Sequence, residues 1–394
     1  MTVKMHQTKY LIIGGSAAGI SAANTLAKLE PQARILCITA EQVKPYNKCF
    51  LVDWLVGEKE RAQLDLQLNP QVELWLGLKV LSLDVQAKIA YLSDGNLVGY
   101  EKALLAIGAQ AFRPEIPGIL ENTNVFNFHD EQDVSSLSDF IVQKKPKKAI
   151  VIGAGLTGLE CADALWRCGL KVTVLERSGQ VLGKLVDQVG AKKIAEFMHD
   201  LEIGLYLNTS ISMISPEQVT LNSGEIIKAD LIVLAAGVRP NKLEILNGEL
   251  DCLGLHLRVN SYLQTNLPSL WAAGDLIAVP EIITGKIAPS CSWPDAMQQG
   301  CYAAQNMADQ HKAYPGMLQV ANSHFFGQDL ISFGVLELKQ DNLGLNSHVH
   351  GQAKNYQKLL LDQDSQLKGA LLIGDTTSYP ALKRAILTRQ PWVL

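Results

Sequence analysis

Two glycine-rich segments constrain this chain most strongly, because each follows a short apolar stretch and leads into a segment rich in alanine. Residues 10–19 read Tyr-Leu-Ile-Ile-Gly-Gly-Ser-Ala-Ala-Gly, and residues 149–158 read Ala-Ile-Val-Ile-Gly-Ala-Gly-Leu-Thr-Gly. Glycine at such a turn lets the backbone approach a pyrophosphate, and the N-terminus of the following helix offers it unpaired N–H groups. The sequence therefore predicts two strand–turn–helix units, each suited to bind a dinucleotide.

A later pair of segments repeats with the same spacing. The turn at Asp94-Gly95 precedes Leu-Ala-Ile-Gly108, and the turn at Ser223-Gly224 precedes Leu-Ala-Ala-Gly237, so the two glycines of each pair are equally far apart. Two copies of one unit suggest that one protein holds two nucleotides.

The composition is that of a globular protein with a large core. At 394 residues, 47% of them hydrophobic and 19% charged, the chain is long enough for two or three domains. A net charge of −4 gives no sign of a nucleic-acid or anionic-membrane partner. No apolar run reaches the roughly 18 residues that a membrane helix needs, and the N-terminus shows no apolar signal core. We therefore expect a cytoplasmic protein.

The seven cysteines favour neither a disulfide framework nor a thiolate metal site, because their number is odd and no C-x-x-C pair occurs. We therefore expect no metal. Five of them are predicted to be small buried side chains, namely Cys37, Cys161, Cys168, Cys252 and Cys301.

Apolar runs and turn signals predict the elements around the two loops. Fully buried parallel strands are expected at residues 10–14, 34–39, 149–153 and 171–176, and helices at 17–29 and 156–168. Short strands between residues 72 and 105, with Asp94-Gly95 as a hairpin turn, predict an antiparallel meander. Residues 205–235 repeat that pattern.

The pattern changes again from about residue 318 onward. Strands are expected at 331–338, 358–361 and 369–374, and a helix at 379–388. The predicted fold class is therefore α/β, with two Rossmann-like dinucleotide-binding domains of three layers. Each carries an antiparallel meander, and a small C-terminal α+β domain follows.

The second loop is a complete G-x-G-x-x-G formed by Gly153, Gly155 and Gly158, and Glu176 ends the next strand. A carboxylate at that point accepts hydrogen bonds from a ribose 2′-hydroxyl and would repel a 2′-phosphate, which favours NADH. Arg177 stands next to it and could accept a phosphate, so NADPH stays open as an alternative.

The first loop has Ser16 where the middle glycine usually stands, and the alternative to a nucleotide loop is an ordinary strand-to-helix turn. The interpretation of the first loop as a nucleotide loop is supported by residues 265–275, which end in Ala-Ala-Gly274-Asp275. An Asp directly after such a turn can bind a ribityl hydroxyl beside a pyrophosphate. The alternative to a ribityl-binding role is that a strand simply ends in a Gly-Asp turn, which is common in proteins.

The order of these motifs resembles the FAD- and NAD(P)H-dependent pyridine nucleotide–disulfide oxidoreductase superfamily. The series comprises the two loops, Leu-Ala-Ile-Gly108, the stretch from Leu-Ala-Ala-Gly237 to Asn241, and Gly274-Asp275, and it continues with residues 293–300 and 303–306. Within the superfamily the chain is most similar to the NADH:rubredoxin reductases and the flavin portion of assimilatory nitrite reductases. Residues 322–327 and 371–375 fit that branch.

The resemblance implies three domains: an FAD-binding domain of residues 1–114 and 245–315, an NAD(P)H-binding domain of 115–244, and an interface-like domain of 316–394. It also implies that hydride passes from the nicotinamide to the flavin and that the electrons then leave to an acceptor. Members of the superfamily are dimers or monomers, so either a monomer or a homodimer is expected.

The resemblance also implies roles for single residues. Gly14 and Gly19 would lie at the FAD pyrophosphate, Asp275 at the ribityl chain, and Glu41 at the adenosine ribose. The helix that begins near Pro294 would direct its N-terminus at the flavin. The expected cofactor-binding residues are Gly14, Ser16, Ala17, Gly19, Glu41, Lys48, Ala106, Gly108, Gly153, Gly155, Leu156, Thr157, Gly158, Glu176, Arg177, Gly237, Gly274, Asp275, Pro294 and Ala296.

The expected catalytic residues are Glu160, Lys48 and Cys49. Glu160 matches the family position beside the nicotinamide. The alternative is a glutamate on the exposed face of a helix, which would give the same sequence pattern. The chain lacks the family's C-x-x-x-x-C and His-x-x-x-x-Glu patterns, which excludes a two-cysteine mechanism. Asp53 stands where relatives often place the Lys that pairs with this carboxylate, so Glu160 lacks its usual partner unless Lys48 supplies it.

Cys49 leaves two interpretations open. Relatives with a single redox cysteine place it at a similar point, and a neighbouring Lys would lower its pKa. The Gly-x-Pro pattern of those relatives is missing, which favours simple packing near the flavin.

We therefore expect an NADH-dependent flavoprotein that reduces a small carrier such as a rubredoxin or ferredoxin. The first alternative is an NADH oxidase, peroxidase or coenzyme A-disulfide reductase that uses Cys49. The second is a slow-turnover redox sensor or interaction subunit.

Overall fold

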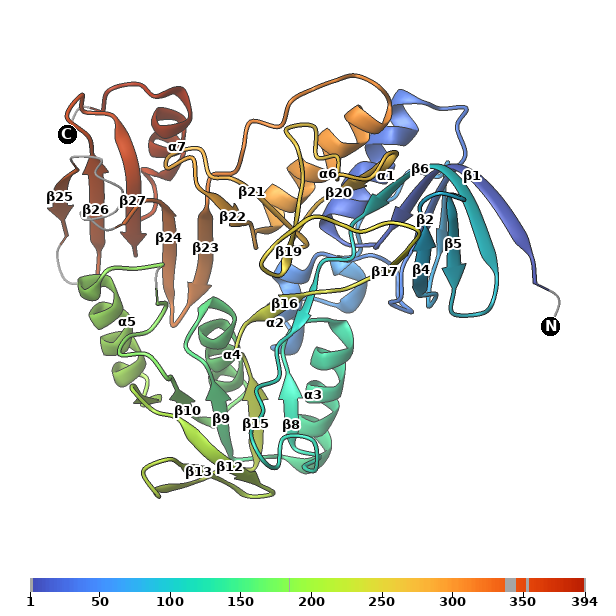
Figure 1. The fold of residues 1–394 in the computed structure, drawn as a ribbon. Helices are drawn as coiled ribbons and strands as arrows, with labels where there is room; N and C mark the ends of the chain where they lie inside the picture. The colour runs from blue at the N-terminus through green and yellow to red at the C-terminus, as the bar shows by residue number, and fades with distance from the viewer. Residues whose placement is uncertain (1–2, 184, 337–344, 352–353, 393–394) are drawn as a thin grey trace. The chain divides into compact units, whose positions relative to one another are not determined.

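The computed structural model describes residues 3–183, 185–336, 345–351 and 354–392 (Figure 1). The chain forms two compact units, and each combines segments that are distant in the sequence. The first unit consists of Met1–Cys49, Arg61–Gln110 and Arg239–Leu318, and the second of Phe50–Glu60, Ala111–Val238 and Gln319–Leu394.

The first unit is built on an eight-stranded sheet whose centre is parallel. Its strands are β1 (Met5–Ile13), β2 (Ile35–Ile38), β3 (Val72–Trp75), β4 (Val80–Asp84), β5 (Ile89–Leu92), β6 (Leu97–Leu105), β17 (Glu244–Leu246) and β20 (Leu270–Ala272). The order is β17-β4-β5-β6-β1-β2-β3, with β20 paired to β6. All four residues of β2 are buried, as expected for a parallel strand covered on both faces.

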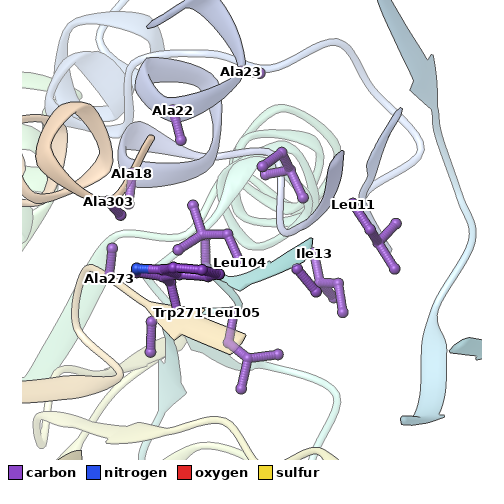
Figure 2. Close-up of a cluster of buried hydrophobic side chains, with 14 of the residues drawn as sticks. Leu11, Ile13, Ala18, Ala22, Ala23, Leu104, Leu105, Trp271, Ala273 and Ala303 are labelled. Atoms are coloured by element: carbon purple, nitrogen blue, oxygen red, sulfur yellow. The ribbon is translucent and has the colours of Figure 1, made fainter. Parts of the chain in front are cut away.

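Helices α1 (Ala17–Leu29) and α6 (Trp293–Met307) of this unit pack closely because small residues line their contact. A Cβ atom on Gly300 would lie 2.1 Å from the carbonyl oxygen of Ala18. Figure 2 shows Ala18 and Ala303 in the same buried cluster as Leu104 and Trp271 of the sheet. The two helices therefore form one layer on the parallel strands.

Smaller elements complete the first unit. A four-stranded sheet contains β18 (Cys252–Leu253), β19 (His256–Arg258), β21 (Ile277–Pro280) and β22 (Ile287–Pro289). The 3₁₀ helix η2 (Arg61–Leu64) belongs to this unit as well. The 3₁₀ helix η1 (Lys48–Phe50) and the strands β7 (Ala109–Ala111) and β16 (Val238–Pro240), which pair with each other, lie where the chain passes from one unit to the other.

The second unit contains a five-stranded parallel sheet of order β11-β10-β9-β15-β8. Its strands are β8 (Val125–Asn127), β9 (Lys148–Ile152), β10 (Lys171–Leu175), β11 (Gly204–Tyr206) and β15 (Leu231–Leu234). The accompanying helices are α2 (Leu51–Leu55), α3 (Glu131–Lys144), α4 (Leu156–Arg167) and α5 (Gln188–Asp200). An antiparallel meander is formed by β12 (Ile211–Ser215), β13 (Gln218–Leu221) and β14 (Ile226–Lys228).

An antiparallel sheet from the C-terminal part belongs to the same unit. It runs β23 (Val320–Phe325), β24 (Gln328–Gly334), β27 (Leu367–Ile373), β26 (Tyr356–Leu361) and β25 (Asn346–His350), followed by α7 (Tyr379–Thr388). Asp187, the N-cap of α5, accepts hydrogen bonds from Tyr356 and Lys358, both at 2.8 Å. Partly buried polar contacts thus join α5 to this sheet.

The predicted fold class is confirmed, and the expected helices at 17–29 and 379–388 have the bounds of α1 and α7. Four local expectations were wrong. Residues 205–235 were expected to repeat the meander, but β11 and β15 pair in parallel with β10 and β9, so only β12, β13 and β14 form it. β3 pairs in parallel with β2, so only β4, β5 and β6 form the first meander. Cys252 is exposed, and Cys168 and Cys301 are half-buried. The strand expected at 331–338 is β24, which ends at Gly334, and residues 337 and 338 lie outside the described part.

No described helix combines the length and the apolar character that crossing a membrane requires. The predicted domain boundaries stay a prediction.

Candidate functional site

The first glycine-rich loop joins β1 to α1, and the surrounding backbone requires its glycines. Gly14 has a φ of +117°, and a Cβ atom there would lie 2.1 Å from the carbonyl oxygen of Ala106. A Cβ atom on Gly19 would lie 1.8 Å from the carbonyl oxygen of Gly14. Both distances are far below van der Waals contact, so only glycine lets α1 begin this close to the sheet.

The second loop, between β9 and α4, repeats these contacts at equivalent positions. Gly153 has a φ of +110°, and its Cβ atom would lie 2.4 Å from the carbonyl oxygen of Ala235. A Cβ atom on Gly158 would lie 2.0 Å from the carbonyl oxygen of Gly153. At Gly155, by contrast, a Cβ atom would meet no atom of the described chain within 4 Å beyond its immediate neighbours. Packing requires the outer glycines, and the middle one faces open space.

Helices α1 and α4 both begin with N–H groups that no side chain caps within the described residues. Ser16 is the N-cap of α1 and Gly155 that of α4, both with extended backbone. The first-turn N–H groups, which include those of Ala17, Leu156 and Thr157, are therefore available to an anion. A pyrophosphate fits this donor set at each loop, so the residues present fit two dinucleotides.

Glu176, at the end of β10, lies against the second loop. Its carboxylate accepts the Ala154 N–H at 2.7 Å, the Ser178 N–H at 2.7 Å and the Ser178 hydroxyl at 2.6 Å. Burial alone would raise the pKa of Glu176, but these hydrogen bonds outweigh it and leave the pKa below its usual value. Glu176 is therefore a fixed negative charge beside the loop. Arg177 is exposed next to it.

The first unit brings Lys48, Glu41 and Asp275 together. The Nζ atom of Lys48 lies 3.2 Å from Oε1 of Glu41. Burial raises the pKa of Asp275 to about 6, and the positive charge of Lys48 opposes that rise. Lys48 thus interacts electrostatically with both Glu41 and Asp275, and all three residues are expected to bind FAD.

The Gly274-Asp275 turn is held against α6 by a residue that the sequence did not single out. Gln299 is fully buried and accepts the Gly274 N–H at 2.7 Å through its Oε1. Its position on the buried face of α6, four residues after buried Asp295, is the signal that could have identified it. The first turn of α6 contains Pro294 and Ala296, and its N-cap, Ser292, makes no side-chain capping bond in the described structure.

Gly108 and Gly237 end the repeated Leu-Ala-x-Gly segments with φ values of +60° and +100°. Asn241 fixes the first of them: its N–H donates to the Gly108 carbonyl at 2.9 Å, and its side-chain amide donates to the Ile107 carbonyl at 2.7 Å. Asn241 is thus a second positioning residue without a predicted role.

Glu160 lies on α4 directly after Gly158-Leu159, and its partner comes from the C-terminal sheet. The Ser323 hydroxyl donates to Oε1 of Glu160 at 2.6 Å. Burial raises the pKa of Glu160, and this hydrogen bond opposes the rise. Lys48, the expected alternative partner, is paired with Glu41 instead.

Cys49 lies in η1, just ahead of the five-residue helix α2. Its side chain is exposed and in no disulfide, and its N–H donates to Oδ1 of Asn47 at 3.0 Å. Asp53, where relatives often place a Lys, forms an ion pair with Lys59 at 3.0 Å.

The expected cofactor residues fall into two groups that match the two units. The first unit holds Gly14, Ser16, Ala17, Gly19, Glu41, Lys48, Ala106, Gly108, Gly274, Asp275, Pro294 and Ala296. The second holds Gly153, Gly155, Leu156, Thr157, Gly158, Glu176, Arg177 and Gly237. Among the residues that the structure describes, no group of three His, Cys, Asp or Glu side chains is placed to hold a metal ion.

Comparison with known families extends over most of the chain. A family model described as pyridine nucleotide-disulphide oxidoreductase matches residues 8–300. A second, described as the C-terminal domain of rubredoxin NAD+ reductase, matches residues 321–390.

Individual relatives cover the chain from end to end. It is 28% identical to the NADH-dependent phenylglyoxylate dehydrogenase subunit epsilon of Aromatoleum evansii, over 98% of this chain and 93% of the relative. It is 26% identical to the ferredoxin–NAD(+) reductase component of the 3-phenylpropionate/cinnamic acid dioxygenase of Photorhabdus laumondii, over 97% of each chain. The crystal structure of NADH:rubredoxin oxidoreductase from Clostridium acetobutylicum shares the fold, with a TM-score of 0.80 at 23% identity over 98% of this chain and 97% of that one.

Proposed function

The chain belongs to the pyridine nucleotide-disulphide oxidoreductase family, and we propose that it passes electrons from NADH to a small redox protein, a rubredoxin or a ferredoxin. The family binds FAD and NAD(P)H, so the protein is a flavin-dependent NAD(P)H oxidoreductase. The observation that carries the proposed acceptor is the match of residues 321–390 to the C-terminal domain of rubredoxin NAD+ reductase. A cytoplasmic location is part of the same proposal.

In the first unit, we propose that Gly14, Ser16 and the α1 N-terminus hold the FAD pyrophosphate. The uncapped N–H groups of α1 support this, because they stabilise a bound anion. Asp275 would accept a ribityl hydroxyl, and Glu41, with Lys48 beside it, would bind the adenosine ribose. The N-terminus of α6, at Pro294 and Ala296, would stabilise negative charge on the reduced flavin. The bound FAD supplies hydride acceptance and release of electrons to a carrier.

In the second unit, we propose that Gly155, Thr157 and the α4 N-terminus bind the NADH pyrophosphate. The open space at Gly155 supports this assignment. Glu176 would accept the ribose hydroxyls and repel a 2′-phosphate, which makes NADH the preferred donor. Glu160 would lie beside the nicotinamide.

Two observations keep other functions as candidates. Cys49 is exposed beside Lys48, which supports a single-cysteine NADH oxidase, peroxidase or coenzyme A-disulfide reductase. The Aromatoleum relative is a subunit of a larger dehydrogenase by name, which supports an interaction subunit with slow turnover of its own.

An acceptor panel with Cys49→Ser separates these candidates. NADH oxidation is measured with rubredoxin, ferredoxin, coenzyme A disulfide, peroxide and oxygen, and Cys252→Ser serves as a control because Cys252 is also exposed. We expect the fastest turnover with a protein carrier and no effect of either substitution. Loss of turnover in Cys49→Ser alone would establish the thiol mechanism, and slow turnover with every acceptor would favour the subunit.

A further inference from the structure

Two carboxylates of α4 bind the hairpin that β23 and β24 form. Oε1 of Glu160 accepts the Ser323 hydroxyl at 2.6 Å, and one helical turn later Oδ1 of Asp163 accepts the Phe326 N–H at 2.9 Å. Both bonds lie within the second unit, and Ser323 is only 9% exposed. The helix that follows the second glycine-rich loop is thus fastened at two points to the C-terminal sheet.

We propose that Ser323 is a positioning residue for the hydride step, whose hydroxyl holds the Glu160 carboxylate in place and favours its ionised form. The inference rests on the proposed function, because it takes Glu160 to lie beside the nicotinamide. It assigns the C-terminal sheet a direct influence on the NADH site.

Besides burial, the Ser323 hydroxyl is the group that acts on the pKa of Glu160. On α4, Arg167 pairs with Asp163 at 3.7 Å and also with Glu58. Among the other charged groups on neighbouring elements, Lys59 pairs with Asp53 at 3.0 Å, and His324 pairs with Asp329 at 2.7 Å. The remaining titratable neighbour on α4 is Cys161, a buried thiol whose pKa lies above its usual value because of burial. Arg167, Lys59 and His324 therefore each have a charged partner other than Glu160.

Burial and the Ser323 hydroxyl act on Glu160 in opposite directions. Burial disfavours the carboxylate and raises its pKa, whereas a hydroxyl that donates to the carboxylate stabilises the charged form. Removing the hydroxyl leaves the burial effect unopposed. The pKa of Glu160 must then rise further, and with it the midpoint of any rate that depends on its ionisation.

The test compares Ser323→Ala with Ser323→Thr, which keeps the hydroxyl, and with Ser332→Ala as a matched control. Ser332 is 4% exposed on the adjacent strand β24, and its hydroxyl is not a partner of Glu160 in the described structure. Isotope-labelled glutamate is followed by carbon NMR against pH, with the Glu160 carboxyl signal assigned through Glu160→Gln. The rate of FAD reduction by NADH is measured over the same pH range in rapid-mixing experiments.

We expect Ser323→Ala to move both midpoints upward by about one pH unit, the size expected when a hydrogen bond to a charged group is lost. Ser323→Thr should stay within a few tenths of a unit of the unsubstituted protein, and Ser332→Ala should not move either midpoint. An unchanged Glu160 midpoint in folded Ser323→Ala overturns the inference. If NADH fails to reduce the FAD of the unsubstituted protein, the proposed function fails instead, and the NMR titration still decides the role of Ser323.

Discussion

At the residue scale, the nucleotide loops depend on glycines whose replacement would push a methyl group into a carbonyl oxygen. Gly14 meets Ala106 in this way, and Gly153 meets Ala235. Both glycines also have φ values that side chains rarely adopt. The same steric requirement therefore acts on both loops, and if they hold the two ligands that we propose, replacing each glycine should affect one ligand only.

Gly153→Ala should weaken NADH binding by roughly tenfold or more while FAD stays bound, because the loop must shift to relieve the clash. Gly14→Ala should lower the FAD content of the purified protein. Flavin absorbance per chain and an NADH titration measure the two effects. Gly95→Ala is the control. Gly95 also has a positive φ, +85°, but a Cβ atom there would meet no atom of the described chain within 4 Å beyond its immediate neighbours. Loss of FAD in Gly153→Ala would contradict the assignment of the loops.

Glu176→Gln should lower NADH affinity about tenfold and narrow the preference for NADH over NADPH, since the charge that repels a 2′-phosphate is removed. The glutamine can still accept an N–H from the loop, which limits structural damage. Dissociation constants for both nucleotides provide the measurement, and Arg177→Ala shows whether the neighbouring guanidinium binds phosphate. An unchanged preference in Glu176→Gln would remove Glu176 from the specificity site.

At the element scale, sequence signals were reliable where they were local. The bounds of α1 follow from an apolar run after a glycine turn, and the hairpin between β5 and β6 follows from Asp94-Gly95. β3 was wrongly assigned to a meander because short apolar strands carry no mark of their pairing direction. The Ser323–Glu160 bond joins residues 163 apart in the sequence, and no local pattern encodes such a contact.

The contact of α5 with the C-terminal sheet was also beyond sequence reasoning. Asp187 caps α5 by accepting the Gly190 N–H at 2.9 Å, and it also accepts bonds from Tyr356 and Lys358. A capping Asp is recognisable in a sequence, but its second role depends on which strand folds back onto it. Helix α5 can therefore be predicted from the sequence, but its contact with the C-terminal sheet cannot.

Asp187→Ala should destabilise the protein by about 2–4 kcal/mol, because it removes a helix cap and leaves the partly buried Lys358 without its carboxylate partner. Asp130→Ala is the matched control. Asp130 caps α3 by accepting the Asp133 N–H, and its loss should lower the free energy of unfolding by only about 1 kcal/mol. Denaturant unfolding of both variants measures the difference. Equal losses would show that the bonds to the sheet contribute nothing.

The pH dependence of this contact has a defined sign. Burial alone would raise the pKa of Asp187, but hydrogen bonds from Lys358, Gly190 and Tyr356 outweigh it and lower the pKa below its usual value. A depressed carboxylate pKa contributes stability above the unfolded-state value of about 3.9, and that stability is lost as pH falls through the folded-state pKa. The difference between Asp187→Ala and the unsubstituted protein should therefore shrink at acid pH.

At the scale of the whole molecule, the chain uses one strand–turn–helix design twice. The outer glycines of both loops make equivalent contacts, and the expected cofactor residues divide between the two units without exception. The sequence predicted this duplication because the motifs are local and ordered. Asp163, Asp187 and Glu160 also accept hydrogen bonds from the C-terminal sheet of the second unit, and no motif shows these contacts.

We propose that the first unit holds FAD and that the second receives NADH, which reduces the flavin for a protein carrier. Anaerobic titration of the purified protein with NADH, followed at the flavin absorbance band, tests this most directly. We expect one FAD for each chain, full bleaching of the band with one equivalent of NADH, and its rapid return when oxidised rubredoxin or ferredoxin is added. A protein that carries no flavin, or whose flavin NADH leaves oxidised, would contradict it.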